Sequence, residues 1–459
     1  MTAGYRPDPA ILLLGPDFFD PVEPAQFPEC HQRFVNGRWA GRIGLGAIDW
    51  QAHFCRFEPL PDNLRQPLAL RYHGHQFRVY NPEIGDGRGF LFAQLRDENA
   101  RLLDLGTKGS GQTPYSRHAD GRLTLKGGVR EILATEMLEA LGVNTSRTFA
   151  LFETGEQLDR GDEPSPTRSA VLTRLSHGHI RIGTFQRLAF LGETDNIARL
   201  VRYCLEQLYG ESAGDDGAAN ALRLFDLVSA ATADLAASYL ASGFVHGVLN
   251  SDNINITGES FDYGPWRFTP YWDPDFTAAY FDHYGLYAFG RQPEAIHWDL
   301  AQFAGALTLV TDAPPLSEAL SEWSGRFEQA LVRRLLRRLG VPPVTPERDS
   351  ELASLIIRAL QSQAVTIDRF FFDWRGGRNP GAEPYRSDDF TALGTALDGR
   401  AVPAAHSYWS DPEPCSMHIE EVEAIWSAIA ERDDWRPLED KVKAIRRMGE
   451  AMRADARAG

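Results

Sequence analysis

The chain has 459 residues, of which 43% are hydrophobic, and its formal net charge is −16 at pH 7. This length exceeds the usual size of a single domain, so two lobes that share a cleft are expected. The negative charge argues against nucleic acid or an anionic membrane as the main partner, because both repel an acidic surface.

The four cysteines, Cys30, Cys55, Cys204 and Cys415, form no CxxC motif and are too few for a disulfide scaffold. This usage favours a reducing compartment and disfavours a structural zinc site, so the cysteines are expected to have no special role. The N-terminal segment MTAGYRPDPAILLLGPDFF has no basic region and only a short apolar run. Such a segment is typical of neither a signal peptide nor a membrane span, and a cytoplasmic protein is therefore expected.

Residues 1–60 are rich in proline and aromatic side chains and show little periodicity, which predicts an extended arm packed on the rest of the chain. In residues 61–182 short apolar runs alternate with turn residues, as in an antiparallel meander. Within this region, apolar residues at helical spacing predict one helix over residues 129–141. The expected strands of this small sheet cover residues 76–80, 90–95, 102–105, 148–152 and 170–175.

Residues 183–459 are mainly helical in pattern, with helices expected over 196–208, 218–240 and 316–339. The fold class is therefore expected to be α+β and bilobal. A small, mainly antiparallel-sheet N-lobe with one key helix would precede a larger, mainly helical C-lobe. The last of these helices carries four arginines that are expected to form a solvated face: Arg333, Arg334, Arg337 and Arg338.

The segment 246–264, HGVLNSDNINITGESFDYG, gathers Asp252, Asn253 and Asp262 within a short stretch. Its alternating apolar residues predict short strands around a turn that presents Asp252 and Asn253 at its tip. Magnesium prefers oxygen ligands and takes the rest from phosphates and water, so Asn253 and Asp262 are candidate ligands. Protein kinases use a catalytic-loop Asn and the Asp of an Asp-Phe-Gly motif in this way, and here the second element is Asp-Tyr-Gly. The alternative is ordinary turn chemistry.

Asp252 is the candidate general base, because it neighbours both candidate metal ligands and a base must reach the attacking hydroxyl. The sequence contains no GxSxG nucleophile elbow and no Walker A loop. Acyl transfer and P-loop chemistry are therefore disfavoured.

The loop Gly85-Asp86-Gly87-Arg88-Gly89 lies between two predicted strands. Backbone amides of Gly85 and Gly87 can approach phosphate oxygens where side chains are absent, and Arg88 adds positive charge. The same letters are also common in a simple hairpin turn. The loop alone does not decide between these two interpretations.

Lys108 follows a predicted strand in LGTKGSGQTPYSR, and Glu131 lies on the helix that comes next. A Lys-Glu pair of this kind positions nucleotide phosphates in kinases. A solvated lysine and an exposed glutamate are the alternative. Asp120 and Gly121 form either another turn or a second nucleotide contact, and their spacing does not distinguish the two.

Arg174 and Arg181 flank two histidines in TRLSHGHIRIG. Guanidinium groups bind phosphates through fixed donor forks, so two of them could supply the positive charge that the acidic chain lacks elsewhere. Salt bridges with carboxylates are the alternative. The His-Gly-His motifs at 73–75 and 177–179 have no partners at metal-ligand spacing and are expected to be structural.

The ordered motifs between about residues 70 and 310 resemble those of the selenoprotein O (SelO/YdiU) family. The motifs that carry the resemblance are GHQF, GDGR, LGTKGSGQTPYSRHADGR, VRE, SRTFAL, HIRIGTFQR, HGVLNSDNINITGESFDYGP and QPEAIHWDLAQFAGAL. The resemblance implies a protein-kinase-like fold and a protein adenylyltransferase that places AMP from ATP on Ser, Thr or Tyr hydroxyls, releasing pyrophosphate. In that family the nucleotide lies inverted relative to ordinary kinases.

Carried over by residue, the resemblance implies nucleotide contacts, magnesium ligands at Asn253 and Asp262, and a base at Asp252. The implied nucleotide contacts are Gly85, Gly87, Arg88, Lys108 positioned by Glu131, Asp120, Gly121, Arg174 and Arg181. The chain departs from the family at Arg78, where Gly is usual, and at Lys126, where Arg is common. The C-terminal third also lacks the family's Pro-Arg-Asn-His segment and a terminal cysteine or selenocysteine.

Several alternatives stay open at this point. The same residues could carry out ordinary γ-phosphoryl transfer as a protein kinase, or transfer UMP with manganese in place of magnesium. Self-modification is also open. The missing His-Arg-Asp loop motivates a nucleotide-binding pseudokinase scaffold, although a scaffold would not need Asp252, Asn253 and Asp262 together. A metal hydrolase is the weakest option.

Overall fold

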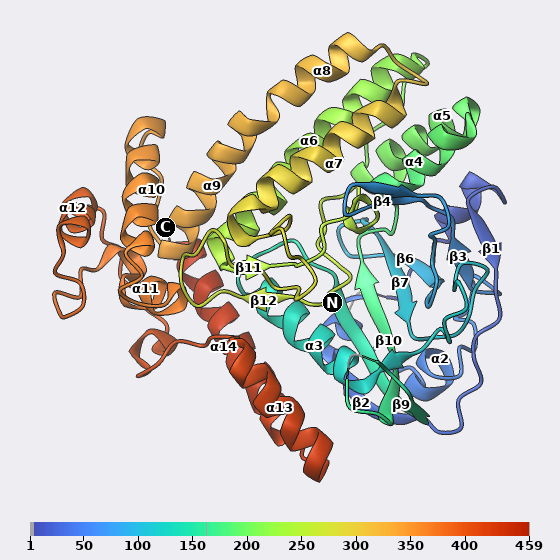
Figure 1. Cartoon of the computed structure of the whole chain (residues 1–459), viewed down its shortest axis with the longest axis horizontal. Helices are drawn as coiled ribbons and strands as arrows, with labels where there is room; N and C mark the ends of the chain where they lie inside the picture. Colours follow the sequence, from blue (N-terminus) through green and yellow to red (C-terminus); the bar gives the residue numbers. More distant parts are fainter. Residues whose placement is uncertain (1–3, 162, 459) are drawn as a thin grey trace.

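The computed structural model describes residues 4–161 and 163–458. An antiparallel sheet built from the first part of the chain lies beside a group of long helices built from the rest, so the fold is α+β (Figure 1). The sheet has the strand order β1-β3-β6-β7-β10-β9-β2, with β8 paired to β10. Its strands are β1 (Phe19–Pro21), β2 (His31–Val35), β3 (Leu68–Leu70), β6 (Leu91–Arg96), β7 (Leu102–Lys108), β8 (Leu123–Thr124), β9 (Arg147–Leu158) and β10 (Thr167–Ser176).

Both faces of this sheet are covered, which explains why β6 and β7 are buried along nearly their whole length. One face packs against α3 (Leu125–Ala140), whose first turn is capped by the Thr124 hydroxyl. The other face packs against aromatic residues of the first sixty positions, including the ring pairs Phe54–Phe92 and Phe57–Phe90. The proline- and aromatic-rich N-terminal segment therefore forms one side of the sheet's core and supplies the strands β1 and β2.

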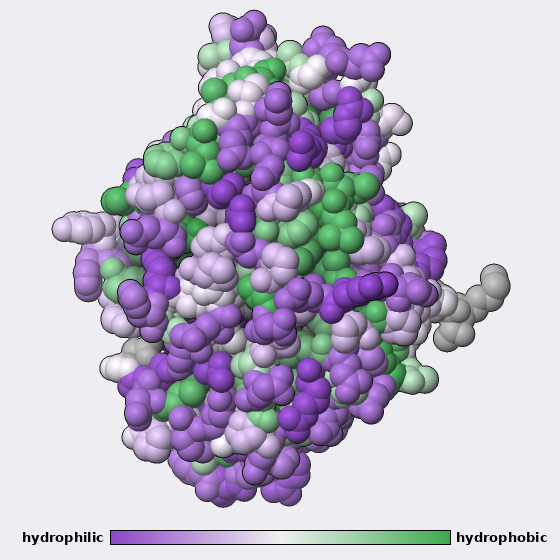
Figure 2. All heavy atoms as spheres, turned by 90° about the vertical axis from the view of Figure 1, so that its right-hand side faces the viewer, coloured by the Kyte–Doolittle hydropathy of each residue, from purple (hydrophilic) through white to green (hydrophobic). Residues whose placement is uncertain are grey.

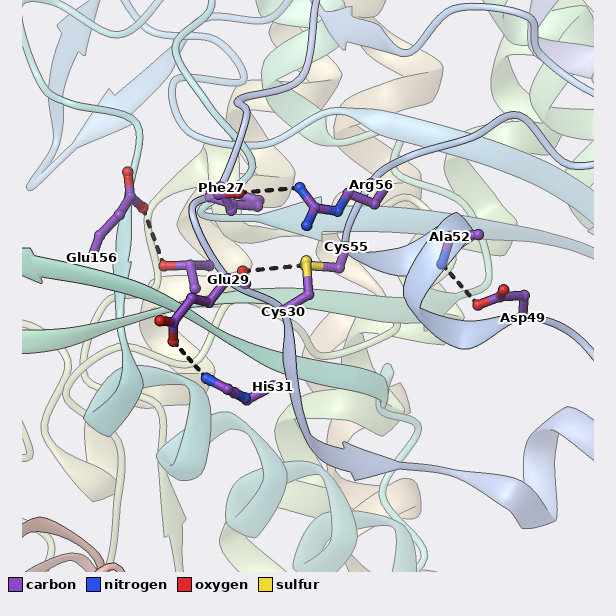
Figure 3. The surroundings of a disulfide bond; sticks show 10 residues. Phe27, Glu29, Cys30, His31, Asp49, Ala52, Cys55, Arg56 and Glu156 are labelled. Atoms are coloured by element: carbon purple, nitrogen blue, oxygen red, sulfur yellow. Dashed lines mark hydrogen bonds and ion pairs between the residues drawn. A yellow bond between two sulfur atoms is a disulfide. The ribbon is translucent and has the colours of Figure 1, made fainter.

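Cys30 and Cys55 form a disulfide that joins β2 to the end of α2 (Trp50–Phe54) (Figure 3). The expectation that all four cysteines lack a structural role is therefore wrong for this pair. Spacing in the sequence could not reveal it, because pairing depends on the approach of the two side chains in space. Cys204 is a buried free thiol and Cys415 a partly buried one.

The helical region begins after β10 and surrounds a second core. In Figure 1, α6, α7 and α9 run side by side, and each contacts its neighbour through apolar residues. Its α-helices are α4 (Ile182–Leu191), α5 (Thr194–Tyr203), α6 (Gly217–Ser242), α7 (Gln292–Leu307), α8 (Ala313–Ser321), α9 (Trp323–Leu339), α10 (Pro346–Gln361), α11 (Ile367–Asp373), α12 (Asp388–Leu397), α13 (Ile419–Arg432) and α14 (Arg436–Ala458). Short helices complete the fold: η1 (Ala10–Leu14), α1 (Gly37–Arg42), η2 (Cys204–Tyr209), η3 (Ser251–Asn253), η4 (Phe289–Arg291), η5 (Arg375–Gly377) and η6 (Ser407–Ser410).

Among the described helices, α6 alone is long and apolar enough to cross a membrane, and most of that stretch is buried inside the protein. This burial is typical of a core helix. The face of the molecule on the side of β1 and α5 is covered mostly by hydrophilic residues, with hydrophobic residues in separate patches (Figure 2).

Three predicted elements need correction. The single helix expected over 316–339 is two helices, α8 and α9, that meet at Glu322. The helix expected over 196–208 changes at Cys204 from α to the wider π form of η2. The solvated arginine face is also wrong for Arg338, which is buried and lies 2.6 Å from the Asp368 carboxylate.

The strand-turn-strand unit expected over 246–264 is absent from the described structure. The neighbouring strands β11 (Phe244–Val245) and β12 (Arg267–Phe268) lie outside the segment, which is a loop with η3 at its centre. Its alternating apolar residues are buried because they anchor the loop in the core, not because they form a ladder. A further small sheet, β4 (Gly74–Gln76) with β5 (Val79–Asn81), packs against η3.

Candidate active site

A cavity of about 400 Å³ lies between the end of the main sheet and the loop 246–264. This volume is in the range of small-molecule sites. The residues that line it include Tyr72, Gly85, Asp86, Gly87, Arg88, Lys108, Tyr115, Arg117, Arg174, His179, Arg181, Asp252 and Asp262. Residues from five distant stretches of sequence therefore meet at one polar cavity.

Lys108, at the end of β7, is buried and makes two close ionic contacts. Its Nζ lies 2.5 Å from Oε1 of Glu131 on α3 and 2.8 Å from Oδ1 of Asp262. Glu131 is itself buried in the helix that packs on the sheet. The structure thus brings the predicted lysine and glutamate together, and it places both beside the aspartate of the Asp-Tyr-Gly motif.

Arg174 and Arg181 converge on the same cavity from β10 and from the N-cap position of α4. Arg174 Nη2 lies 3.3 Å from Asp262 Oδ1, and Arg181 Nη2 lies 3.2 Å from Asp86 Oδ1. Both side chains also have a buried Nε that donates to no described group. Together with Lys108, the two guanidinium groups make this wall of the cavity cationic, which favours an anionic ligand.

Asp262 follows Phe261 in a left-handed backbone conformation, with φ of 61°. Burial alone would raise its pKa. The ammonium of Lys108 and the guanidinium groups of Arg174 and Arg88 instead hold the pKa of this carboxyl well below its usual range. Asp262 is therefore a permanent anion among cations, as a ligand for a divalent cation needs to be.

Asp252 has the opposite environment. It lies in η3 and is buried, and its Oδ1 accepts no hydrogen bond from any described residue. Burial, reinforced by the charge of Asp262 and only partly offset by Arg181, raises the pKa of Asp252 to about 6. A carboxylate with a free oxygen and a raised pKa can accept a proton from a ligand hydroxyl.

Asn253 follows Asp252 in η3 and is half-buried. Its Nδ2 donates to the backbone carbonyl of Val248 at 3.1 Å, which leaves the amide oxygen as its ligand atom. Asp262 lines the cavity, whereas Asn253 is not among its lining residues. An amide oxygen and an ionised carboxylate are ligand types that suit magnesium or manganese. Among the described residues, no group of three or more His, Cys, Asp or Glu side chains is placed to hold a metal ion by itself.

The glycine loop lines the cavity together with a second loop, residues 109–122, that lies against it. A Cβ added at Gly85 would overlap the ring of Tyr115, and one at Gly87 would press on the Tyr115 carbonyl. Glycine is thus required here for the close packing of the two loops. Arg88 is exposed at the cavity rim and contributes to the field around Asp262.

Asp120 and Gly121 do not line the cavity. Asp120 is exposed and lies 2.9 Å from Arg160 Nη1, and its Oδ1 accepts from the backbone N–H of Arg122. Gly121 has φ of 68° and packs against the Gly111 backbone. In this structure the pair therefore forms a turn at the far end of the second loop, while its neighbour Ala119 reaches the cavity wall.

Three acidic or basic residues of the site were missed by the motif interpretation. Asp86 holds Arg181, and Arg117 stands at the cavity wall and lowers the pKa of Asp252 to a small extent. Asp299 on α7 is fully buried, its Oδ2 has no described partner, and burial together with the charge of Asp252 raises its pKa strongly. The tripeptide HWD in the motif around α7 was the available signal, because an aspartate is unusual on a buried helix face.

The two His-Gly-His motifs occupy positions consistent with structural roles. His73 Nδ1 lies 2.8 Å from the Tyr80 hydroxyl, and His179 Nδ1 lies 3.1 Å from Asp104 Oδ2. Burial lowers the pKa of His177 to about 4, so this side chain is neutral at pH 7. His179 alone of the four lines the cavity.

Comparison with known proteins extends over nearly the whole chain. The family model described as "Protein adenylyltransferase SelO" matches residues 2–393. A protein from Synechocystis sp. named "Protein nucleotidyltransferase YdiU" is 40% identical over 463 residues, which cover 95% of this chain and 97% of that protein. Proteins of the same name from Synechococcus elongatus and Gloeobacter violaceus are 42% and 41% identical, each over 96% of this chain and 95% of the relative. All residues that line the cavity lie within the matched range.

Proposed function

Because the chain belongs to the protein adenylyltransferase SelO family, we propose that this protein nucleotidyltransferase moves AMP from ATP onto Ser, Thr or Tyr hydroxyls of other proteins. The proposal gives each wall of the cavity its own task. The wall of Lys108, Arg174 and Arg181 binds phosphates, and the wall of Asp252 receives the hydroxyl.

One observation carries the proposal: cationic side chains gather on one wall of the cavity, and a carboxylate that forms no ion pair with a described side chain lies on the other. Lys108, Arg174 and Arg181 line the first wall, and Asp252 lines the second. A phosphate chain suits the first wall and a substrate hydroxyl suits the second. Such complementarity is what a group-transfer site requires, because both reactants must be held in line.

In the proposed reaction, the hydroxyl oxygen of the protein substrate attacks the α-phosphorus of ATP. The bond from the α-phosphorus to the oxygen that bridges the α- and β-phosphates breaks, and pyrophosphate leaves. Asp252 Oδ1 takes the hydroxyl proton. Lys108, fixed by Glu131, and the two arginines stabilise the charge that develops on the phosphates, and this positioning is expected to supply most of the rate enhancement.

Asn253 and Asp262 are proposed to hold magnesium, with manganese as the alternative. A bound divalent cation neutralises phosphate charge. Asp262 also keeps Lys108 and Arg174 directed into the cavity through its two ion pairs. The nucleotide contacts proposed for Gly85, Gly87, Arg88, Asp120 and Gly121 require the second loop, residues 109–122, to settle around the bound nucleotide.

The proposal includes a protein-kinase-like, two-lobe arrangement. Residues 61–182 would form the N-lobe, with residues 1–60 packed on it, and residues 183–459 the C-lobe. The cavity's position between the β7 and β10 ends and the loop 246–264 supports this division. We also propose that the protein works in the cytoplasm and acts on itself as well as on other proteins.

Intact-protein mass spectrometry after incubation with magnesium and ATP tests the function, with an Asp262→Ala variant as control. Transfer of AMP adds roughly 329 mass units and transfer of a phosphoryl group about 80, because the two reactions differ in which phosphorus is attacked. An AMP adduct that the control lacks supports the proposal. A phosphoryl adduct would indicate a protein kinase instead. No adduct on the protein or on added cell extract, also with manganese and UTP, would indicate a nucleotide-binding scaffold.

A further inference from the structure

Exposed aromatic side chains gather beside the loop that carries Asp252. We define the aromatic ridge as Phe77, Tyr280, Phe281 and Tyr284. The ring centroids of Phe77 and Phe281 lie 5.9 Å apart, and those of Tyr280 and Phe281 lie 5.1 Å apart. Tyr280 is 80% exposed and Tyr284 is 93% exposed. Large aromatic residues left in water so close to one another mark an interaction surface.

The aromatic ridge is attached directly to the catalytic loop through Asn250, two positions before Asp252. The backbone N–H of Phe77 donates to Asn250 Oδ1 at 3.0 Å, and the Tyr287 hydroxyl donates to the same oxygen at 2.7 Å. The backbone N–H of His75 donates to Ser251 Oγ at 2.7 Å. The ridge and the proposed base are therefore parts of one hydrogen-bonded unit.

The ridge is held in place by its own backbone. Phe77 and Arg78 form the turn between β4 and β5, and both have left-handed backbones, with φ of 50° and 63°. Positive φ at both central residues is the geometry of a two-residue type I′ hairpin turn, and it costs energy for residues other than glycine. The carboxylate of Asp282 accepts from the backbone N–H groups of Leu286 and Tyr287, each at 2.8 Å, and so fixes the segment of Tyr280 and Tyr284. The rings are thus presented on an ordered framework.

The charges around the ridge are paired with one another. Arg78 lies 2.8 Å from Glu294 and Arg291 lies 3.3 Å from the same carboxylate. The Asp282 carboxylate is buried and accepts hydrogen bonds from the backbone N–H groups of Leu286 and Tyr287. These charged side chains are therefore occupied, and His283 is an exposed polar residue within the ridge segment. The chemistry that the ridge offers to a partner is mainly apolar and aromatic.

We propose that the aromatic ridge is the docking surface for the protein substrate, and that it binds an apolar side chain in an extended segment next to the modified hydroxyl. The inference rests on the proposed function, because that reaction requires a polypeptide to reach Asp252. The ridge is joined to the catalytic loop through the hydrogen bond from Phe77 to Asn250, so residues that flank a hydroxyl bound at Asp252 would lie within reach of these rings. The ridge thereby determines specificity for the residues that flank the target hydroxyl.

The test uses synthetic peptides that each carry one Ser, Thr or Tyr, with either leucine or glutamine at the neighbouring positions. A Tyr280→Ser and Tyr284→Ser double variant is compared with wild type and with a Leu309→Ser and Val344→Ser double variant, whose exposed apolar residues lie on α7–α8 and α9–α10 connections. The wild type and the control are expected to prefer the leucine peptides. The ridge variant should lower kcat/KM for these peptides about tenfold through KM, because it removes buried apolar contact area.

The affinity for MgATP, measured by calorimetry, is expected to be unchanged in the ridge variant. Equal kcat/KM values for the ridge variant and the control would overturn the docking proposal, as would a wild type without preference for leucine or without activity on any peptide. A wild-type dimer that the ridge variant converts to a monomer would assign the ridge to a second copy of the chain instead. The mass experiment above separates these results from a failure of the proposed function, since it does not depend on peptide recognition.

Discussion

The two walls of the cavity differ in how their charges are satisfied. On the sheet wall, Lys108 contacts both Glu131 and Asp262, and Arg174 adds a second cation at Asp262. On the loop wall, Asp252 Oδ1 is buried without a described partner. Asp299 Oδ2, on α7 and outside the cavity lining, is also buried without a described partner. The pKa of Asp262 is accordingly held well below its usual range, whereas burial raises that of Asp252 to about 6.

This difference shows that two aspartates close in sequence can be given separate tasks by their neighbours alone. The paired carboxylate remains ionised and suits charge stabilisation, while the unsatisfied one suits proton transfer. The buried carboxylate oxygen of Asp252 destabilises the loop wall, because a buried acceptor without a donor is unfavourable. The tightly packed apolar core between the sheet and α3 stabilises the fold and offsets this loss.

The largest expected effect follows from neutralising the ionised carboxylate of Asp262. Asp262→Asn is expected to lower the rate of AMP transfer about 10³-fold, because it removes both a metal ligand and the partner of Lys108 and Arg174. Incorporation of α-labelled ATP into protein measures the effect. Asp275→Asn, at an exposed site outside the cavity, serves as the matched control and should retain full activity.

A loss of stability at low pH that arises from residues outside the cavity must be distinguished from the effects of the cavity aspartates. The pKa of His177 is about 4 in the folded protein because of burial, against an ordinary value near 6.5. The unfolded chain therefore binds the extra proton first, and stability is lost as the pH falls from 6.5 towards 4, by up to about 3 kcal/mol. Urea unfolding at several pH values should show this slope in the wild type and a flatter one in His177→Asn. An equal slope in both would contradict the assignment, and the exposed His283→Asn provides the control.

The free energy of unfolding also distinguishes the two walls, because substitutions of Asp252 and Asp262 should change it in opposite directions. Asp252→Asn is expected to raise the free energy of unfolding by about 1–2 kcal/mol, since it removes a buried charge whose oxygen has no donor. Asp262→Asn is expected to lower it by about 2 kcal/mol, since it leaves buried cations with less counter-charge. Chemical unfolding of both variants at pH 7 measures the signs. Two changes of the same sign would remove the distinction between the walls.

The smallest expected effect concerns the hairpin that supports the loop wall. Arg78→Gly should raise the free energy of unfolding by up to about 1 kcal/mol, because φ of 63° suits glycine and the exposed Glu294 pair contributes little. Arg78→Ala is the matched control: it loses the same side chain but keeps the strained backbone, so it should not stabilise. If Arg78→Gly and Arg78→Ala raised the free energy of unfolding equally, the positive φ of Arg78 would not be the source of the gain.

The sequence predicted the α+β class, the helix around 129–141 and the strands β6, β7, β9 and β10, because their apolar periodicity is long and regular. The short strands β1, β2, β3 and β8 were not predicted, and the strand expected over 76–80 contains the turn between β4 and β5. Prediction from the sequence also failed for the segment 246–264, where alternation reflects the anchoring of a loop and not a strand. The contact of Lys108 with Glu131 followed a known spacing of strand and helix. The contact of Arg181 with Asp86 depends on tertiary packing, which no local pattern encodes. Asp299 had a signal in the tripeptide HWD, but its position relative to Asp252 depends on tertiary packing as well.

The Cys30–Cys55 pair and the aromatic ridge were also beyond sequence reasoning, for the same reason. Both join residues that approach only after the chain has folded: Cys30 and Cys55 within the N-terminal segment, and Phe77 and Phe281 from the sheet region and the helical region. Cavity residues that stand in a distinctive motif, such as Asp252 and Asp262, could be proposed from the sequence. Asp120 and Gly121 also stand in a clear motif, but they lie outside the cavity lining, and the Asp120 side chain pairs with Arg160.

The most direct test of the division between the walls is a paired measurement on Asp252→Asn: the MgATP dissociation constant by calorimetry and the rate of AMP transfer on the same preparation. The account predicts a dissociation constant close to that of the wild type and a transfer rate at least about 100-fold lower, because Asp252 acts on the hydroxyl and not on the nucleotide. A loss of MgATP affinity as large as the loss of rate would contradict it, since Asp252 would then belong to the phosphate-binding wall.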